Sequence, residues 1–228
     1  MTAIVHMSEA KAREEICRVG ESLFQRGYVH ATAGNISVRL AHGFLITPTD
    51  ACLGFLDPAD LALLDHDGHQ LSGKRASKTI ALHRKIYEAS DNAPGSWPAQ
   101  CVIHTHSTHC VALSLHATGT ELLPPITPYF VMKVGHVPLI PYFRPGDLLA
   151  ADAVADAILH YAKVDTPIRA VMLSRLGPNV WHQDLSSAMA TLEELEETAK
   201  LMQLSQQPPD HLSDAQIDEL RQTFDAAW

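Results

Sequence analysis

Three histidines, His104, His106 and His109, lie within six residues of the stretch QCVIHTHSTHC, residues 100–110. The apolar residues before them predict a buried strand. On a strand, residues i and i+2 project to the same face about 6 to 7 Å apart, so His104 and His106 can converge on one ion. Two imidazoles are two-thirds of a three-histidine site, which zinc favours and manganese or cobalt also accepts. The spacing therefore indicates a metal site.

The alternative for His104 and His106 is a pair of partly buried polar residues without a ligand. Two neutral imidazoles in an otherwise apolar strand would lack hydrogen-bond partners, and their burial would then cost free energy. We therefore favour a metal. His109 lies where the strand gives way to the helix-like pattern THCVALSLHA, so we expect it to support the site rather than to be a ligand.

Periodic patterns around the histidines define the elements that must hold them. Helices are predicted over residues 8–26, 77–90, 148–163 and 184–205, with Ser8 and either Asp184 or Ser186 as N-caps. Strands are predicted over 35–40, 43–50 and 101–107, and on both sides of the turn in RAVMLSRLGPNVWH, residues 169–182. Short strands are expected in the proline-rich stretch 124–147, and a polar, loosely packed tail with a short helix is expected over 206–228. One α/β domain over residues 1–228, with its core at 8–205, follows.

Composition narrows the classes of function. The chain has 228 residues, 46% of them hydrophobic, and a net charge of −9. This charge argues against nucleic acid as the main partner, because phosphate binding needs a basic face.

The N-terminal residues lack the basic and apolar segments of a secretion signal, and no uncharged apolar run reaches the roughly 18 residues that span a membrane. We expect a cytoplasmic protein with no membrane partner. Four cysteines without a C-x-x-C motif indicate neither a disulfide framework nor a zinc ribbon.

Six motifs in order make the chain resemble the class II aldolase/adducin family, to which fuculose-phosphate aldolase belongs. They are ATAGNISVR, FLITPTD, SGKRASKTIALHRKIY, VIHTHSTHCVALS, ITPYFVMKVG and LEELEETAKL. The regions around the last two resemble the branch of 3-oxo-tetronate 4-phosphate decarboxylases most. The resemblance implies a three-layer αβα sandwich with a mostly antiparallel sheet. It also implies a homotetramer with sites between subunits, and a metal, usually zinc, held by residues matching His104 and His106.

Two positions depart from the aldolase pattern. Aldolases of the family carry a glutamate that is both metal ligand and acid/base, and this chain has Thr79 at that catalytic position. Where the family carries a third histidine ligand, this chain has Leu176. His136, His182, His109 or a water can complete the coordination sphere, and we favour His136 or water.

The turn in TAGNIS offers backbone N–H groups and the amide of Asn35 to a phosphate. By resemblance, other polar residues belong to the same pocket, namely Ser37, Thr49, Ser77 and Lys78. Lys78 adds positive charge beside the phosphate, unless it is a solvated surface lysine.

Two further side chains have candidate roles on the substrate. Arg144 in FRPGD, like Arg175 in SRLGP, can clamp a carboxylate, or can instead pair with an acidic neighbour such as Asp147. By resemblance, Tyr129 is the candidate general acid that protonates the enediol carbon, unless it is a core aromatic residue.

Retro-aldol cleavage and β-decarboxylation both send electrons into a carbonyl that a metal can polarise. Decarboxylation needs no base to remove a hydroxyl proton, so it tolerates Thr79 better. The sequence and its resemblance therefore predict a metal-dependent decarboxylase that converts 3-oxo-tetronate 4-phosphate to a triose phosphate, such as dihydroxyacetone phosphate, and CO₂. The alternatives are an aldolase of a short-chain sugar phosphate and a catalytically silent adducin-like scaffold.

Overall fold

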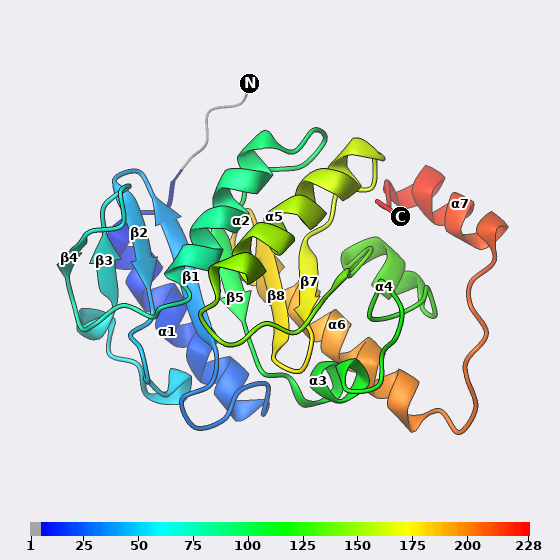
Figure 1. The fold of residues 1–228 in the computed structure, drawn as a ribbon, viewed down its shortest axis with the longest axis horizontal. Helices are drawn as coiled ribbons and strands as arrows, with labels where there is room; N and C mark the ends of the chain where they lie inside the picture. Colours follow the sequence, from blue (N-terminus) through cyan, green and yellow to red (C-terminus); the bar gives the residue numbers. More distant parts are fainter. Residues whose placement is uncertain (1–5) are drawn as a thin grey trace.

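The computed structural model describes residues 6–228. The centre of the fold is one β-sheet (Figure 1). Within these residues it has eight strands in the order β4-β3-β2-β1-β5-β8-β7-β6. All neighbouring strands are antiparallel except β6 and β7. The strands are β1 (Asn35–Leu40), β2 (Gly43–Ile46), β3 (Ala62–Leu64), β4 (Gln70–Ser72), β5 (Cys101–His104), β6 (Leu139–Ile140), β7 (Ala170–Leu173) and β8 (Gly177–His182). Residues 1–5 of the predicted domain lie outside the described residues.

Helices cover both faces of the sheet. One face packs against α2 (Ile80–Asn92) and α5 (Leu148–Lys163), which also contact each other. The other face packs against α1 (Glu9–Gln25), α3 (Thr108–Ser114), α4 (Pro128–Lys133) and α6 (Leu185–Leu204). Two 3-10 turns, η1 (Leu53–Phe55) and η2 (Pro58–Asp60), follow β2. The predicted three-layer αβα sandwich with a mostly antiparallel sheet is confirmed. No helix of residues 6–228 is long and apolar enough to cross a membrane.

Alternation along β5 decides which layer each side chain meets. Cys101 and Ile103 belong to the core formed with α1 and α6, whereas Val102 belongs to the core formed with α2 and α5. His104, two residues after Val102, therefore projects to the α2 and α5 side. The apolar residues of β1 pack on the α1 side, which leaves Asn35 and Ser37 on the same side as His104.

The four helices predicted from the sequence are present as α1, α2, α5 and α6, with ends within three residues of the predicted ones. Ser8 caps α1 by accepting a hydrogen bond from the Lys11 N–H at 3.4 Å, and Asp184 caps α6 through the Ser187 N–H at 2.8 Å. The short strand predicted in the proline-rich stretch is present as β6, but the helix α4 in the same stretch was not predicted. Thr127 accepts a hydrogen bond from the Phe130 N–H at 3.1 Å, and Pro128 occupies the first turn, where its missing N–H costs nothing.

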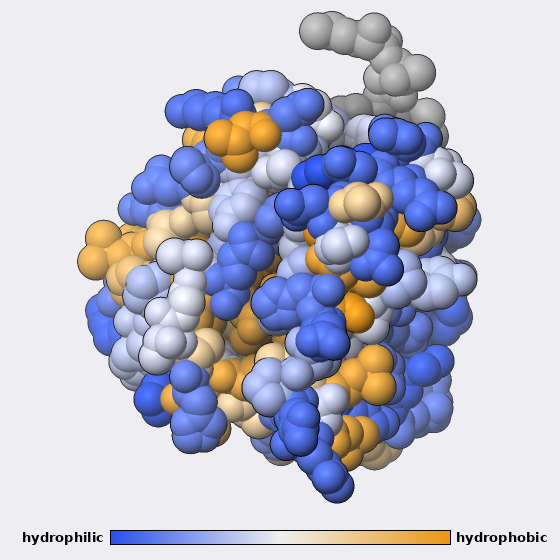
Figure 2. Space-filling view, turned by 90° about the vertical axis from the view of Figure 1, so that its right-hand side faces the viewer, coloured by the Kyte–Doolittle hydropathy of each residue, from blue (hydrophilic) through white to orange (hydrophobic). Residues whose placement is uncertain are grey.

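The C-terminal segment is not the loose tail that its polar composition suggested. Its helix α7 (Asp214–Phe224) packs against α4, with Ile217 buried. Trp228 stacks on His136 with ring centroids 4.2 Å apart and meets Phe130 at 5.7 Å. Seen from the side that bears α7, the surface is mostly hydrophilic with separate hydrophobic patches (Figure 2). The contacts of Trp228 with His136 and Phe130, together with the buried Ile217, therefore hold this otherwise polar C-terminal segment in place.

Candidate active site

Three polar residues lie side by side across the centre of the sheet. Asn35 on β1 is directly opposite His104 on β5, and His104 is directly opposite Asn179 on β8. Residues paired in this way project to the same face, so the three side chains form one row. The row lines a cavity of about 300 Å³, and its members are only 6%, 4% and 0% exposed.

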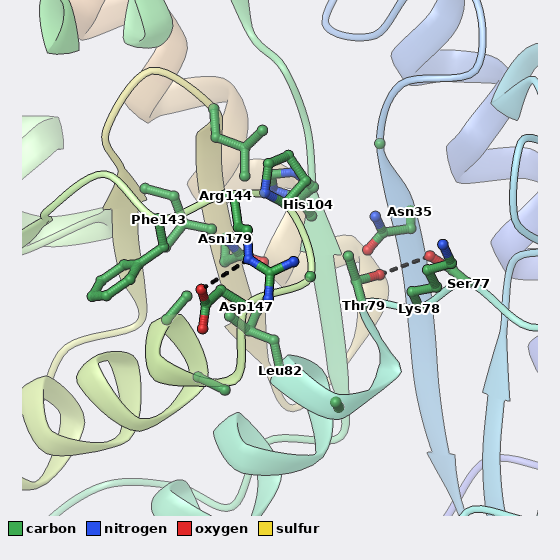
Figure 3. A pocket seen from close by; sticks show the side chains of 18 of the residues that line it. Asn35, Ser77, Lys78, Thr79, Leu82, His104, Phe143, Arg144, Asp147 and Asn179 are labelled. Atoms are coloured by element: carbon green, nitrogen blue, oxygen red, sulfur yellow. Dashed lines mark hydrogen bonds and ion pairs between the residues drawn. The ribbon is translucent and has the colours of Figure 1, made fainter.

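The cavity has two chemically different ends, with His104 between them (Figure 3). One end is formed by the loop of residues 32–35, by Thr49 and by the start of α2. The opposite end is formed by Asn179, by the loop of residues 141–147 and by the start of α5. Residues from five separate segments thus meet around the strand end that carries His104.

Glycine allows the chain segments to approach His104 closely. A Cβ on Gly34, whose φ is +84°, would lie 2.9 Å from the carbonyl oxygen of His104. A Cβ on Gly177, whose φ is +149°, would lie only 1.9 Å from the carbonyl oxygen of Thr105. Both positions therefore require glycine.

His104 is held in one tautomer. Its Nδ1 lies 2.9 Å from the carbonyl oxygen of Pro178, which can only accept a hydrogen bond, so Nδ1 carries the proton. Nε2 then keeps the lone pair that a metal ligand needs. Burial, with a smaller contribution from His106, lowers the pKa of His104 to about 3, so the ring is neutral.

His106 faces His104 with ring centroids 5.1 Å apart. Burial, and then the neighbouring His30, lowers the pKa of His106. Two neutral imidazoles, one with a fixed tautomer, are a donor set that fits a divalent ion of the zinc type.

A third ligand is not evident within residues 6–228. Among the His, Cys, Asp and Glu side chains of these residues, one group of three has ligand atoms close enough together to share an ion. This group is Asp65, Asp67 and His69, on the partly exposed turn between β3 and β4. None of these three lines the cavity. Leu176 lies on the cavity wall, where it offers no ligand atom. The ring of His30, which the sequence did not single out, is 6.4 Å from that of His106.

The end of the cavity at the start of α2 contains most of the polar residues predicted to bind phosphate. Asn35, Thr49, Ser77, Lys78 and Thr79 all line the cavity. The hydroxyls of Ser77 and Thr79 are hydrogen-bonded to each other at 2.8 Å (Figure 3). The first turn of α2 contains no acidic residue, so its backbone N–H groups favour an anion at this end.

Ser37 does not line the cavity, so the structure does not bring it together with the other residues predicted to bind substrate. Its position two residues after Asn35 places it one step deeper on the same face, where its side chain is fully buried. There its hydroxyl is hydrogen-bonded to Nδ1 of His83 at 2.8 Å and to the hydroxyl of Tyr87 at 2.7 Å. Burial, with a smaller contribution from the nearby His104, lowers the pKa of His83 to about 3.

Arg144 lines the opposite end of the cavity and is also paired with Asp147 at 3.3 Å (Figure 3). Both sequence alternatives for this arginine are therefore compatible with its position. Arg175 is exposed and does not line the cavity.

The three histidines considered as a third ligand, and Tyr129, do not line the cavity. His136 is hydrogen-bonded to Glu121 at 2.8 Å, and His109 to Gln203 at 2.7 Å. His182 lines a separate cavity beside Trp97. The expectation that His136 completes the His104 and His106 site is thus not met within this chain, because a carboxylate and the Trp228 ring already hold it. Tyr129 is 61% exposed on α4 and does not line the cavity of its own chain.

Sequence reasoning missed Asn179. The residue interrupts the apolar run of β8, and this interruption was the available signal. Its partners could not be deduced, because the pairing of β8 with β5 joins segments far apart in the chain.

Comparison with known proteins identifies the family of this chain. Residues 14–203 match the family model of the class II aldolase and adducin N-terminal domain. A 3-oxo-tetronate 4-phosphate decarboxylase of Cupriavidus necator is 50% identical over 97% of this chain and 99% of its own. The crystal structure of YgbL from Escherichia coli superposes with a TM-score of 0.81 at 39% identity, covering 93% of this chain and 99% of that one. That of L-fuculose-1-phosphate aldolase from Thermus thermophilus gives 0.70 at 29% identity, covering 85% and 93%. The chain therefore belongs to the class II aldolase and adducin family.

Proposed function

We propose that this protein is a metal-dependent lyase that decarboxylates 3-oxo-tetronate 4-phosphate to a triose phosphate, such as dihydroxyacetone phosphate, and CO₂. The observation that carries the proposal is one cavity in which polar side chains at the start of α2 lie beside a pair of facing histidines. The decarboxylase of Cupriavidus necator, half identical along nearly the whole chain, supports this substrate over a sugar phosphate.

The phosphate of the substrate is held at the α2 end of the cavity in this proposal. Asn35, Thr49 and Ser77 supply neutral hydrogen-bond donors, and Lys78 supplies the positive charge. The N-terminus of α2 adds its backbone dipole. A substrate anchored by its phosphate then extends along the row towards His104.

His104 and His106 are the residues that would hold the ion, which we take to be zinc, with manganese or cobalt as alternatives. When bound, the ion supplies positive charge that stabilises negative charge developing on the C3 oxygen. Water or substrate oxygens would complete its coordination. The fixed tautomer of His104 and the neutral state of both rings support this assignment.

Decarboxylation breaks the bond between C1 and C2, and its electron pair moves towards the C3 carbonyl as CO₂ leaves. No hydroxyl proton has to be removed for this step, so a hydroxyl at Thr79 suffices where an aldolase needs a carboxylate. We assign Thr79, hydrogen-bonded to Ser77 at 2.8 Å, to positioning at the catalytic centre. The carbon C2 must then be protonated.

Tyr129 is the proposed proton donor to C2, acting in the cavity of a neighbouring copy. The tyrosine is exposed on α4 and is therefore accessible to a neighbouring copy, as the proposed homotetramer with sites at subunit interfaces requires. Arg144, despite its pairing with Asp147, remains the candidate cation for the substrate carboxylate. A phosphorylated sugar-acid substrate also fits a cytoplasmic location.

The test is to supply 3-oxo-tetronate 4-phosphate to the purified protein and to measure CO₂ and triose phosphate, with fuculose phosphate supplied in parallel. Stoichiometric CO₂ is expected, with no aldehyde released from fuculose phosphate. Aldehyde without CO₂ would reverse the order of decarboxylase and aldolase. Neither product, together with no uptake of zinc or manganese, would favour the silent scaffold.

A further inference from the structure

We propose that Asn179 recognises the 2-hydroxy carboxylate end of the substrate and thereby selects hydroxy-acid phosphates over simple sugar phosphates. The inference deepens the proposed function and rests on it. It assigns to this residue a specificity role that is separate from phosphate binding and from the histidine pair.

The position of Asn179 in the row is the first argument. Adjacent strands are about 5 Å apart, so Asn35 and Asn179, two strands apart with His104 between them, have Cα atoms about 10 Å apart. A substrate with its phosphate near Asn35 and its carbonyl near His104 must direct its remaining carbons towards Asn179. In Figure 3, Asn179 lies on the opposite side of His104 from Asn35, Ser77 and Lys78.

The unsatisfied amide is the second argument. The side chain of Asn179 is 0% exposed, yet neither Nδ2 nor Oδ1 has a hydrogen-bond partner within residues 6–228. A buried amide without partners costs free energy, and native proteins rarely tolerate one. Because Asn179 lines the cavity, a ligand in the cavity can supply both partners.

The chemistry of a carboxamide identifies the group that it would bind. Nδ2 is a donor and Oδ1 is an acceptor. A carboxylate only accepts hydrogen bonds, and a hydroxyl on the adjacent carbon can donate one. The C1 carboxylate and C2 hydroxyl of a 2-hydroxy-3-oxo acid therefore match the two unpartnered atoms of Asn179. A triose phosphate lacks the carboxylate and satisfies Nδ2 less well.

The surroundings of Asn179 combine apolar and charged side chains. Leu173, Leu176 and Phe143 line this end of the cavity, and Arg144, paired with Asp147 at 3.3 Å, lines it as well. Asn179 therefore orients the carboxylate and the adjacent hydroxyl by hydrogen bonds, whereas Arg144 is the candidate for the opposite charge.

Binding of two ligands by the metal-loaded protein tests this inference. The first ligand is 2,3-dihydroxybutanoate 4-phosphate, which lacks the 3-oxo group and cannot be decarboxylated. The second is glycerol 3-phosphate, which lacks the carboxylate. In calorimetric titrations, Asn179→Leu should weaken the acid by about tenfold or more and should change glycerol 3-phosphate by less than about twofold.

Val180→Ala is the matched control, because Val180 is the adjacent buried residue of β8 and packs on the opposite face of the sheet. It should lower the thermal unfolding midpoint without changing the ratio of the two affinities. Asn179→Asp keeps the shape of the side chain and places a carboxylate against that of the ligand. This variant should weaken the acid selectively, and it provides the test if Asn179→Leu does not fold.

An equal loss of both affinities, or no loss of either, would overturn the inference, as would a wild type that binds the acid no better than glycerol 3-phosphate. The proposed function is tested separately by CO₂ release from wild type. If CO₂ is absent while Asn179→Leu still discriminates between the ligands, the reaction assignment fails and the recognition of a hydroxy-acid phosphate remains.

Discussion

Nδ1 of His104 donates a hydrogen bond to the carbonyl oxygen of Pro178 across 2.9 Å. The bond joins β5 to β8, and it leaves Nε2 as the nitrogen with the free lone pair. The backbone of the sheet thus fixes the protonation pattern of a side chain in the cavity. Because the acceptor is a main-chain atom, only changes that move β8 should alter this pattern.

His106→Ala should abolish metal binding, because it removes one of the two imidazoles that face each other 5.1 Å apart. Metal content per chain, measured by elemental analysis after zinc loading, gives the readout. His109→Ala is the matched control, because His109 is hydrogen-bonded to Gln203 outside the cavity and should leave the content unchanged. Full metal content in His106→Ala would remove the pair from the proposal.

The stability of the metal-free protein should fall as the pH is lowered from about 6.5 towards 3. The pKa of His83 is about 3 in the fold against an ordinary value of 6.5, so between these values the unfolded chain binds a proton that the folded chain does not. The stability contribution is complete above pH 6.5. It is lost by up to about 1.4 kcal/mol per pH unit below it. Urea unfolding with a chelator present, from pH 4.5 to 7.5, measures the total slope, to which His104 contributes in the same way because its pKa is also about 3.

His83→Asn should reduce that slope by one proton while its amide keeps a hydrogen bond to Ser37. Ser37→Ala is the control, because it removes the 2.8 Å hydrogen bond to His83 and leaves the titrating ring in place. It should lower stability at every pH with little change in slope. An unchanged slope in His83→Asn would show that His83 is not the source of the pH dependence.

Glu196→Ala should lower the free energy of unfolding by about 3 kcal/mol. Glu196 is 3% exposed on α6, and its carboxylate accepts hydrogen bonds from the backbone N–H groups of His109 at 2.9 Å and Cys110 at 3.0 Å. These N–H groups belong to the first turn of α3, so the substitution leaves them without an acceptor. Glu197→Ala, at an exposed position whose carboxylate is paired with Lys200 at 3.6 Å, should cost less than about 0.5 kcal/mol. Equal losses in denaturant titrations would contradict this account.

Local patterns predicted the elements that carry the site. The alternation in residues 35–40 coincides with β1, and the alanine-rich pattern over 148–163 coincides with α5. Both elements bury a regular face, so the period of their apolar residues is a direct record of their structure. The pair at His104 and His106 was found for the same reason, since their separation is local.

Residues whose role depends on strand register or on docking could not be assigned in this way. Asn179 reaches the cavity only because β8 pairs with β5, and Ser37 is directed to His83 rather than to the cavity by the alternation of β1. The packing of the C-terminal segment depends on Trp228 meeting His136 and Phe130. Such contacts join distant segments, and no periodic pattern records them.

Gly177→Ala should destabilise the protein by about 3 kcal/mol or more, because the new methyl group would lie 1.9 Å from the carbonyl oxygen of Thr105 at a φ of +149°. Relief of this clash must separate β8 from the chain segment between His104 and His106, so metal affinity should fall together with stability. Gly27→Ala is the matched control, because Gly27 also has a positive φ but has no atom within 4 Å of the added carbon. It should cost about 1 kcal/mol and leave metal affinity unchanged. If both substitutions had equal effects in thermal unfolding and zinc titration, the close approach at Gly177 would not be what positions the histidine pair.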